Sequence, residues 1–400
     1  MAAADRRRQG RDQSHRRTPR AGVPRPLKQA PDMFDLTIPE ELVLLQDQVR
    51  QFGAAVLRER HREFEAAGAV ADPVRAEYAA LGLAGMELPE SLTGAGLGTL
   101  AKALVLEELG AADPGAALAL DALGPALYPL AELGGEATLT RYALPLLEAT
   151  DARALLVWGD SERPGRRCPL IRGGRATGTL PWVPAARADL LVILDTQGAA
   201  VIESGFRLTP VKGSGLRAAG AAELVLEDAP LSSHWENPAG AERALARWRL
   251  YTAALLTGLM RTAAETSREY ALQRVAFGKP IAHHQALAFL IADMHSAVDA
   301  SRILVQEAAW RADAGLPFAD AAATAFVEAA EAGMFVAPNA LQIFGGQGFM
   351  QDLPLEKYLR EARTLALMAG GIDLARDLAG AAVADCTAGF ALSPLRAEDA

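Results

Sequence analysis

Cysteine is scarce in this chain: only Cys168 and Cys386 occur among 400 residues, far apart in sequence. This excludes a disulfide framework and any multi-cysteine metal site, and it is typical of a reducing cytoplasm, where we expect the protein to act. The six histidines offer no His-x-x-x-His pair with a third ligand nearby, so no metal site is predicted. No apolar run approaches the length of about 20 residues that spans a bilayer, so no membrane segment is predicted.

An excess of positive charge is also lacking. The net charge is −9, which argues against nucleic-acid binding by the body of the chain. The exception is the stretch 1–32, which is rich in arginine and proline but has no apolar core, so it is not a secretory signal. We predict a disordered basic tail there, with a polyanion-binding arm or a true start at Met33 as alternatives. A frayed tail is predicted over 389–400.

Half of the residues are hydrophobic, enough for a folded protein of several domains. Residues 33–150 have apolar side chains at helical spacing, and one helix over 100–109 is predicted to end at Gly110. Residues 239–388 have the same spacing over longer stretches, typical of a helical bundle. Between them, 151–238 contain short apolar segments separated by turn residues, which predict strands over 190–195, 199–203, 206–211 and 222–227.

These patterns predict an α+β protein, mostly α. It would have an N-terminal helical domain, a middle β-barrel or sandwich and a C-terminal four-helix bundle.

Two segments of the last region suit an anionic cofactor. The first contains Arg274 and Phe277, with Gln285 following, and an arginine offers a planar fork of donors that matches phosphate oxygens. The second runs from Gln342 through three glycines, Gly345, Gly346 and Gly348, where backbone N–H groups can approach an anion closely. The basic helix with Arg360-Glu361-Ala362-Arg363 and the turn at Ala369-Gly370-Gly371 follow. A lone arginine is usually solvated and a lone Gly-Gly is usually a turn, but their joint spacing favours cofactor binding.

The amino-acid sequences of these two segments resemble known family signatures. Residues 270–281 with Gln285 read YALQRVAFGKPI…Q, and 342–349 with 360–363 read QIFGGQGF…REAR. Both resemble C-terminal signatures of the acyl-CoA dehydrogenase family, and 88–90 and 106–110 resemble its N-terminal pattern. The resemblance covers about 36–385. It implies FAD as cofactor, an acyl-CoA substrate and electron-transfer flavoprotein as acceptor. It also implies residues that hold the adenosine and pyrophosphate end of a neighbour's FAD: Arg274, Phe277, Gln285, Gln342 and Gly346.

The chain departs from that family where proton chemistry is done. The carboxylate base of most members corresponds to Ala369, and the alternative base position on an earlier helix corresponds to Trp248. Neither side chain removes a proton, so no catalytic residue is predicted; Asp373, one helical turn beyond Ala369, is the candidate for a relocated base. Pro184 stands where a hydroxyl residue contacts the flavin, Gly371 replaces a threonine, and 157–165 retain only a remnant of the flavin loop.

These losses remove what would hold this chain's own flavin ring, whereas residues that reach a neighbour's site remain. The chain therefore resembles the base-lacking subunit of actinobacterial heteromeric (α2β2) acyl-CoA dehydrogenases of fatty acid or steroid side-chain β-oxidation. We predict that a base-containing sister subunit completes the enzyme. The alternatives are a self-sufficient dehydrogenase with a relocated base, and a binding or scaffold protein of this fold without redox activity.

Overall fold

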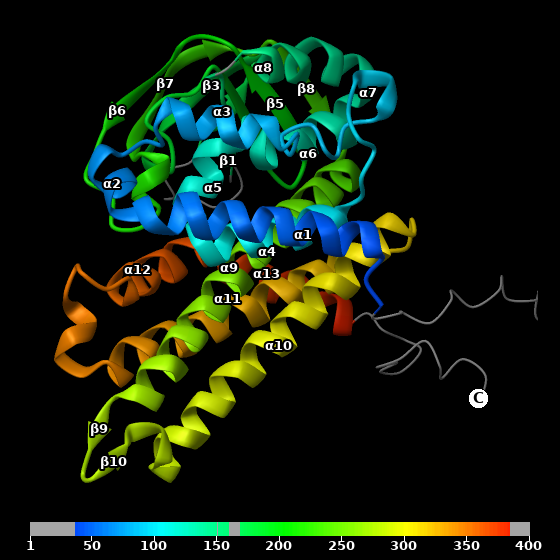
Figure 1. Cartoon of the computed structure of the whole chain (residues 1–400). Helices are drawn as coiled ribbons and strands as arrows, with labels where there is room; N and C mark the ends of the chain where they lie inside the picture. The colour runs from blue at the N-terminus through cyan, green and yellow to red at the C-terminus, as the bar shows by residue number, and fades with distance from the viewer. Residues whose placement is uncertain (1–36, 150, 160–168, 385–400) are drawn as a thin grey trace, which may run out of the picture. The chain divides into compact units, whose positions relative to one another are not determined.

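The computed structural model describes residues 37–149, 151–159 and 169–384 (Figure 1). The predicted tails 1–32 and 389–400, both cysteines and most of the predicted flavin-loop remnant lie outside these residues. Within them, a helical part, two β-sheets and a second helical part follow one another along the chain, so the predicted fold class is confirmed.

Residues 37–149 are helical. The main helices are α1 (Glu40–Phe52), α2 (Glu59–Ala67), α3 (Asp72–Ala80), α4 (Thr99–Ala112), α5 (Pro114–Leu120) and α8 (Leu144–Glu148). Helix α4 is almost entirely buried and packs along α9 (Pro238–Gln273).

The predicted end of α4 at Gly110 is wrong, because this glycine lies inside the helix. A Cβ on Gly110 would collide with the backbone of Leu255 in α9, and one on Gly258 would collide with the backbone of Glu107. The two glycines therefore allow a close helix–helix approach rather than a helix stop.

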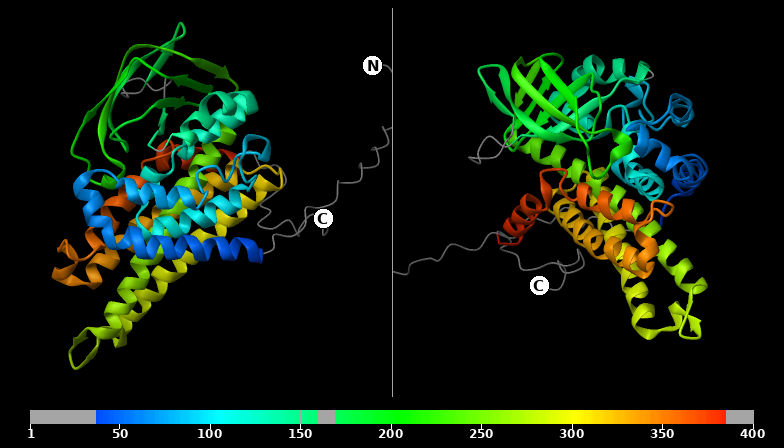
Figure 2. Two further views of the ribbon diagram at one scale, coloured as in Figure 1. Left: turned by 45° about the horizontal axis from the view of Figure 1, so that its top comes forward. Right: turned by 90° about the vertical axis from the view of Figure 1, so that its left-hand side faces the viewer.

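Two four-stranded sheets make the middle part (Figure 2). The first has the order β1-β4-β5-β8 and the second β2-β3-β7-β6. Their bounds are β1 (Ala154–Trp158), β2 (Leu170–Arg172), β3 (Arg175–Val183), β4 (Leu190–Leu194), β5 (Gly198–Ile202), β6 (Phe206–Pro210), β7 (Ala222–Pro230) and β8 (Ser233–Glu236). The four predicted strands correspond to β4 to β7.

Strand β4 is buried on both faces, which explains its continuous apolar run. Leu190, Val192 and Leu194 belong to the large core shared with the helices, whereas Leu191 and Ile193 belong to a smaller core with β3 and β7. The first sheet is therefore sandwiched between the helices and the second sheet.

The last part is a bundle of α9, α10 (Gln285–Asp313) and α11 (Ala319–Ile343), joined by α12 (Leu355–Leu365) and α13 (Gly371–Ala384). Helix α9 begins with Pro238 after Asn237, whose side chain accepts a hydrogen bond from the Gly240 N–H at 3.1 Å. Its far end leads into the short hairpin β9 (Val275–Ala276) and β10 (Lys279–Pro280), visible at the tip of the bundle in Figure 1.

Among the described residues, no single helix is long and apolar enough to cross a membrane; one bent pair, Pro114–Leu120 with Gly124–Glu148, meets the length and composition criteria together. The part of the chain that the structure describes contains no group of three His, Cys, Asp or Glu side chains that could hold a metal ion.

Candidate functional site

The first motif lies where α9 ends. The Arg274 N–H donates to the Tyr270 carbonyl at 2.8 Å, and the Ile281 N–H donates to the Arg274 carbonyl at 2.8 Å, so the chain turns back through the β9–β10 hairpin. Phe277 stands in the hairpin turn with a left-handed backbone (φ 53°) and is 96% exposed. A fully exposed phenylalanine in a strained turn indicates a surface that another molecule covers.

Tyr270 joins this motif to the second one. Its ring stacks on Phe344 with centroids 4.0 Å apart, and its hydroxyl donates to Gln347 Oε1 at 3.1 Å. Phe344 and Gln347 lie at the end of α11 and in the 3-10 turn η8 (Gly345–Phe349). The structure thus brings the two motifs together at one end of the bundle. Sequence reasoning assigned Tyr270 no role of its own, although its place in the last turn of α9, four residues before Arg274, was a usable signal.

The three glycines of the second motif have different surroundings. A Cβ on Gly345 or Gly346 would meet no atom within 4 Å, so the backbone here is open to a ligand. A Cβ on Gly348 would lie 2.5 Å from the Leu341 carbonyl oxygen, so this glycine makes room for the chain's own backbone. Two of the three glycines therefore fit the predicted cradle, and the third has a packing role.

The side chains predicted to bind FAD point away from the chain's interior. Arg274, Phe277, Gln285 and Gln342 are all exposed, as are Gly345 and Gly346. No part of the described chain covers them. A binding site at this place would therefore need a second molecule to form its other wall.

The two positions where a base was sought line one cavity. Ala369 and Trp248 both face a cavity of about 450 Å³, together with Pro184. Ala369 is fully buried and has a left-handed backbone (φ 53°). The remaining lining residues are Leu156, Val157, Trp158, Leu180, Trp182, Val183, Ser214, Gly215, Thr364, Leu367, Met368 and Gly370. None of these lining residues is acidic, basic, histidine or cysteine.

Tryptophan dominates this cavity. Trp158, Trp182 and Trp248 all line it, and the buried Trp248 Nε1–H has no hydrogen-bond partner among the described residues. Pro184 offers no N–H, and its carbonyl already accepts a hydrogen bond from Arg153 Nη2 at 2.8 Å. The cavity is therefore apolar where a flavin ring and a proton-removing carboxylate would need polar groups.

Asp373, the candidate relocated base, is not among the lining residues. Its side chain is 81% exposed and faces Arg376 across 3.8 Å. It lies in the first turn of α13, where a carboxylate interacts favourably with the helix dipole.

The basic helix 360–363 is used inside the chain. Arg360 pairs with Glu65 and Glu356, at 2.9 and 2.6 Å. Lys357 donates to Asp113 at 3.0 Å and to Glu361, and all three of these groups are buried. Burial raises the pKa of Glu361 to about 8. The sequence predicts the basic helix as part of an arrangement that suits an anionic cofactor. Arg360 does not serve that purpose, because Glu65 and Glu356 balance its charge within the chain.

The cavity and the bundle end lie far apart on the same helix. Trp248 and Gln273 both belong to α9, and a rise of about 1.5 Å per residue puts them about 38 Å apart along its axis. One dinucleotide cannot contact both places on a single chain.

The fold is thus a helical part, a pair of sheets and a helical bundle with an open glycine turn at its end. Two family models match: the N-terminal domain of acyl-CoA dehydrogenases over 39–150 and the C-terminal domain over 239–384. The chain is 31% identical over 372 residues to acryloyl-CoA reductase (NADH) of Anaerotignum propionicum, covering 84% of this chain and 93% of that protein. The chain therefore belongs to the acyl-CoA dehydrogenase family.

Solved structures share the fold. Butyryl-CoA dehydrogenase from Megasphaera elsdenii superposes with a TM-score of 0.77 at 24% identity, covering 88% of this chain and 100% of that chain. A chain from the structure of the electron transferring flavoprotein of Acidaminococcus fermentans gives 0.76 at 26% identity, covering 87% and 99%.

FAD is the cofactor of this family, as predicted. The chain suits the two ends of FAD to different degrees. The open backbone at Gly345 and Gly346 beside the exposed motif of Arg274 suits the anionic pyrophosphate end. Among the residues that the structure describes, none that lines the cavity at Ala369 is charged, so none of them suits the proton chemistry at the ring end.

Proposed function

We propose that this chain is a subunit of an FAD-dependent acyl-CoA dehydrogenase, an oxidoreductase that introduces an α,β double bond into an acyl-CoA thioester. In this proposal it lacks its own catalytic base and completes the FAD site of a base-containing sister subunit. The observation that carries the proposal is the cavity at Ala369: both base positions line it, and none of its described lining residues is a carboxylate.

The chain's own residues have binding roles in this proposal. Arg274 donates to pyrophosphate oxygens of the sister's FAD, and the backbone at Gly345 and Gly346 approaches the same anion. Gln285 and Gln342 bind and orient the adenosine end, and Phe277 packs against it or against the sister. FAD supplies the acceptor for the hydride that leaves the β-carbon, and the sister's carboxylate removes the α-proton.

The separation along α9 supports a site shared between chains. About 38 Å of helix separates Trp248 from the end of α9, so the bundle end serves a cofactor whose reactive ring lies elsewhere. An assembly with one complete FAD site per heterodimer satisfies this geometry, as in an α2β2 tetramer. In a homodimer, each bundle end would meet a partner cavity whose described lining contains no aspartate or glutamate.

Two further partners belong to the proposal. An acyl-CoA binds in the sister's site, and an electron-transfer flavoprotein accepts the electrons. The similarity to a chain from an electron transferring flavoprotein structure supports the latter. We place the complex in the cytoplasm, in fatty acid or steroid side-chain β-oxidation.

Co-expression with the base-containing sister tests the proposal. The complex should be yellow, with about one FAD per heterodimer by absorbance and native mass measurement. Arg274→Ala should weaken FAD binding to the complex by at least about tenfold, because a charge-assisted hydrogen bond contributes about 1.5–3 kcal/mol. Arg268→Ala is the matched control, since Arg268 is also exposed and lies in α9, six residues before Arg274; it should leave the FAD content unchanged.

Three outcomes decide between this proposal and its alternatives. If the chain alone binds stoichiometric FAD and oxidises an acyl-CoA at a normal rate, it is a self-sufficient dehydrogenase and the shared-site proposal fails. If neither the chain nor the complex contains flavin, the chain is a scaffold protein of the fold. If Arg268→Ala lowers the FAD content as much as Arg274→Ala, Arg274 has no specific role.

A further inference from the structure

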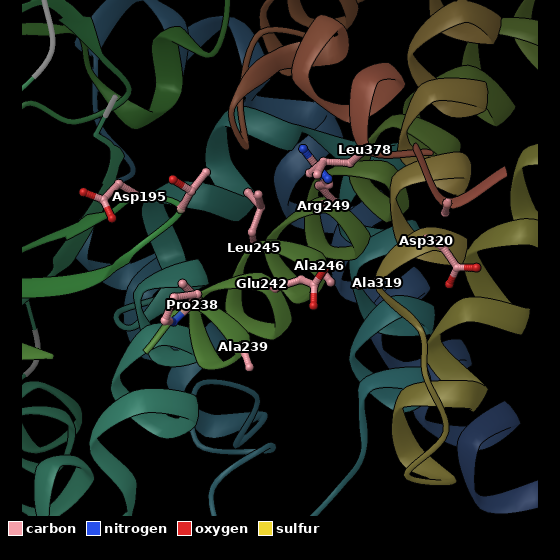
Figure 3. Close-up of a pocket in the computed structure, with 13 residues that line it drawn as sticks. Asp195, Pro238, Ala239, Glu242, Leu245, Ala246, Arg249, Ala319, Asp320 and Leu378 are labelled. Carbon is pink, nitrogen blue, oxygen red and sulfur yellow. The ribbon is translucent and has the colours of Figure 1, made fainter. Parts of the chain in front are cut away.

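A second cavity, separate in its lining from the one at Ala369, opens beside the first half of α9. It has a volume of about 430 Å³ (Figure 3). Its walls come from α9, the start of α11, helix α13 and the turn after β4. The lining residues are Asp195, Thr196, Pro238, Ala239, Ala241, Glu242, Leu245, Ala246, Arg249, Ala319, Asp320, Leu378 and Ala382.

The floor of this cavity contains an unpaired positive charge. Arg249 is only 2% exposed, and its Nε and Nη2 atoms have no hydrogen-bond partner among the described residues. Leu245 and Ala246, also buried, lie beside it on the floor. Burial lowers the pKa of Arg249 to about 10, which still leaves the guanidinium charged at neutral pH. A buried charge without a partner is costly, so a bound anion would stabilise this arrangement.

The rim of the cavity limits which anion can enter. Glu242 and Asp320 are exposed at the rim, and Asp195 lies partly exposed beside them. Three carboxylates repel a ligand that carries several phosphate charges, such as a coenzyme A ester. A single carboxylate carries less charge and has a flat shape that matches the guanidinium fork through two parallel hydrogen bonds.

The walls specify the rest of the ligand. Among the described lining residues, Thr196 is the only polar one apart from Arg249 and the rim acids; alanine, leucine and proline make up the remainder. A cavity of about 430 Å³ has the size of an ordinary small-molecule site. An apolar body of moderate size therefore fits between the acidic rim and the arginine on the floor.

We propose that this cavity binds a monocarboxylic acid with an apolar body, whose carboxylate pairs with Arg249. This site is distinct from the FAD position of the proposed function and does not depend on it. Because the ligand is a free acid rather than a thioester, the site acts as a sensor or carrier of acids and performs no chemistry on them.

Calorimetry on the full chain tests the proposal with decanoate, decanol and decanoyl-CoA. Decanoate should bind at least about tenfold more tightly than decanol, because a charged hydrogen-bond pair contributes about 1.5–3 kcal/mol. Decanoyl-CoA should not compete with decanoate, since the acidic rim repels its phosphates. Equal affinity for decanoate and decanol would overturn the proposal, and so would effective competition by decanoyl-CoA.

Two variants refine the test. Arg249→Met should remove the preference for decanoate over decanol, and without ligand it should not lower the melting temperature, because it removes an unpaired buried charge. Glu242→Gln should keep the preference and bind decanoate somewhat more tightly. If Arg249→Met retains the preference, Arg249 is not the anchor and the proposal fails. If that variant does not fold, the comparison of decanoate with decanol on the unchanged chain still decides.

Discussion

The end of the bundle and the cavity at Ala369 differ in exposure and in the chemistry of their side chains. The bundle end is exposed, and it presents an arginine, two glutamines and an open glycine backbone to the outside. Three tryptophans help to line the cavity, and none of its described lining residues is charged. Both places lie along α9, so one helix connects a region suited to an anion with a cavity whose described lining contains no carboxylate.

The departures from the family pattern gather at one of these two places. The groups missing from the chain are those that would face its own cavity, whereas the motif that faces outward is intact. The proposed shared FAD site accounts for this division between the two places. The comparison is therefore best tested by perturbing each region separately and asking whether stability or cofactor binding responds.

The largest effect on stability is expected from Lys357→Met. This substitution tests whether helix α12 serves the folding of the chain rather than the bundle end or the cavity. Lys357 lies between the buried carboxylates of Asp113 and Glu361. Its removal leaves the buried Asp113 carboxylate without a counter-charge and the buried Glu361 carboxyl group without its hydrogen-bond partner, so the free energy of unfolding should fall by about 3–5 kcal/mol. Urea unfolding of the full chain measures this.

Arg376→Met is the control for that measurement. Arg376 pairs with Glu331 at the surface, where both side chains are about half exposed, and loss of such a pair should cost less than about 1 kcal/mol. Equal effects of the two substitutions would contradict a structural role for the buried cluster.

Ala369→Glu tests the cavity itself, with an intermediate effect. The new carboxyl group would be buried among tryptophans without a partner, so unfolding should require about 1–3 kcal/mol less free energy. The chain alone should gain no dehydrogenase activity, because Pro184 and Gly371 also depart from what a flavin ring needs. Turnover of an acyl-CoA by this variant alone, in an assay with an artificial electron acceptor, would show that a base was all the cavity lacked.

The smallest effect on stability is expected from Gly346→Ala, which tests the bundle end. The added methyl group meets no atom of the chain, so stability should change by less than about 0.5 kcal/mol. FAD content of the complex with the sister should nevertheless fall, since the methyl group occupies space that the anion needs.

Gly348→Ala is the matched control within the same turn. Its methyl group would press on the Leu341 carbonyl at 2.5 Å, so it should cost about 1–3 kcal/mol of stability through overpacking. If Gly346→Ala also destabilises the chain and leaves its FAD content unchanged, the open turn is not a ligand cradle.

Sequence reasoning predicted much of the fold because the signals were local. The strands β4 to β7 follow from short apolar runs between turn residues, and the long bundle helices follow from periodic apolar positions. The interpretation of Gly110 as a helix stop was wrong because a glycine that ends a helix and one that admits a neighbouring helix look alike in sequence. Only the approach of α9 distinguishes them.

The candidate site was predictable where spacing alone defined it. Counting residues led to Ala369 and Trp248 as the two base positions, and the structure brings them to one cavity. The state of Arg249 was not predictable, because an arginine on a helix gives no sign of whether a partner meets it after folding. The same holds for Arg360, whose charge is balanced by Glu65, which lies nearly three hundred residues earlier in sequence.

Helix α13 and the residue before it contribute to the walls of both cavities. Gly370, which precedes it, lines the cavity at Ala369, and Leu378 on the helix lines the cavity at Arg249. Two glycines with positive φ, at 81° and 82°, connect α13 to the rest of the chain, and Ala375 is its only buried residue. Segments held by so few buried contacts open locally long before the whole protein unfolds. We therefore expect local opening of α13 to change the walls of both cavities together, and hydrogen exchange of the α13 amides would measure the rate of that opening.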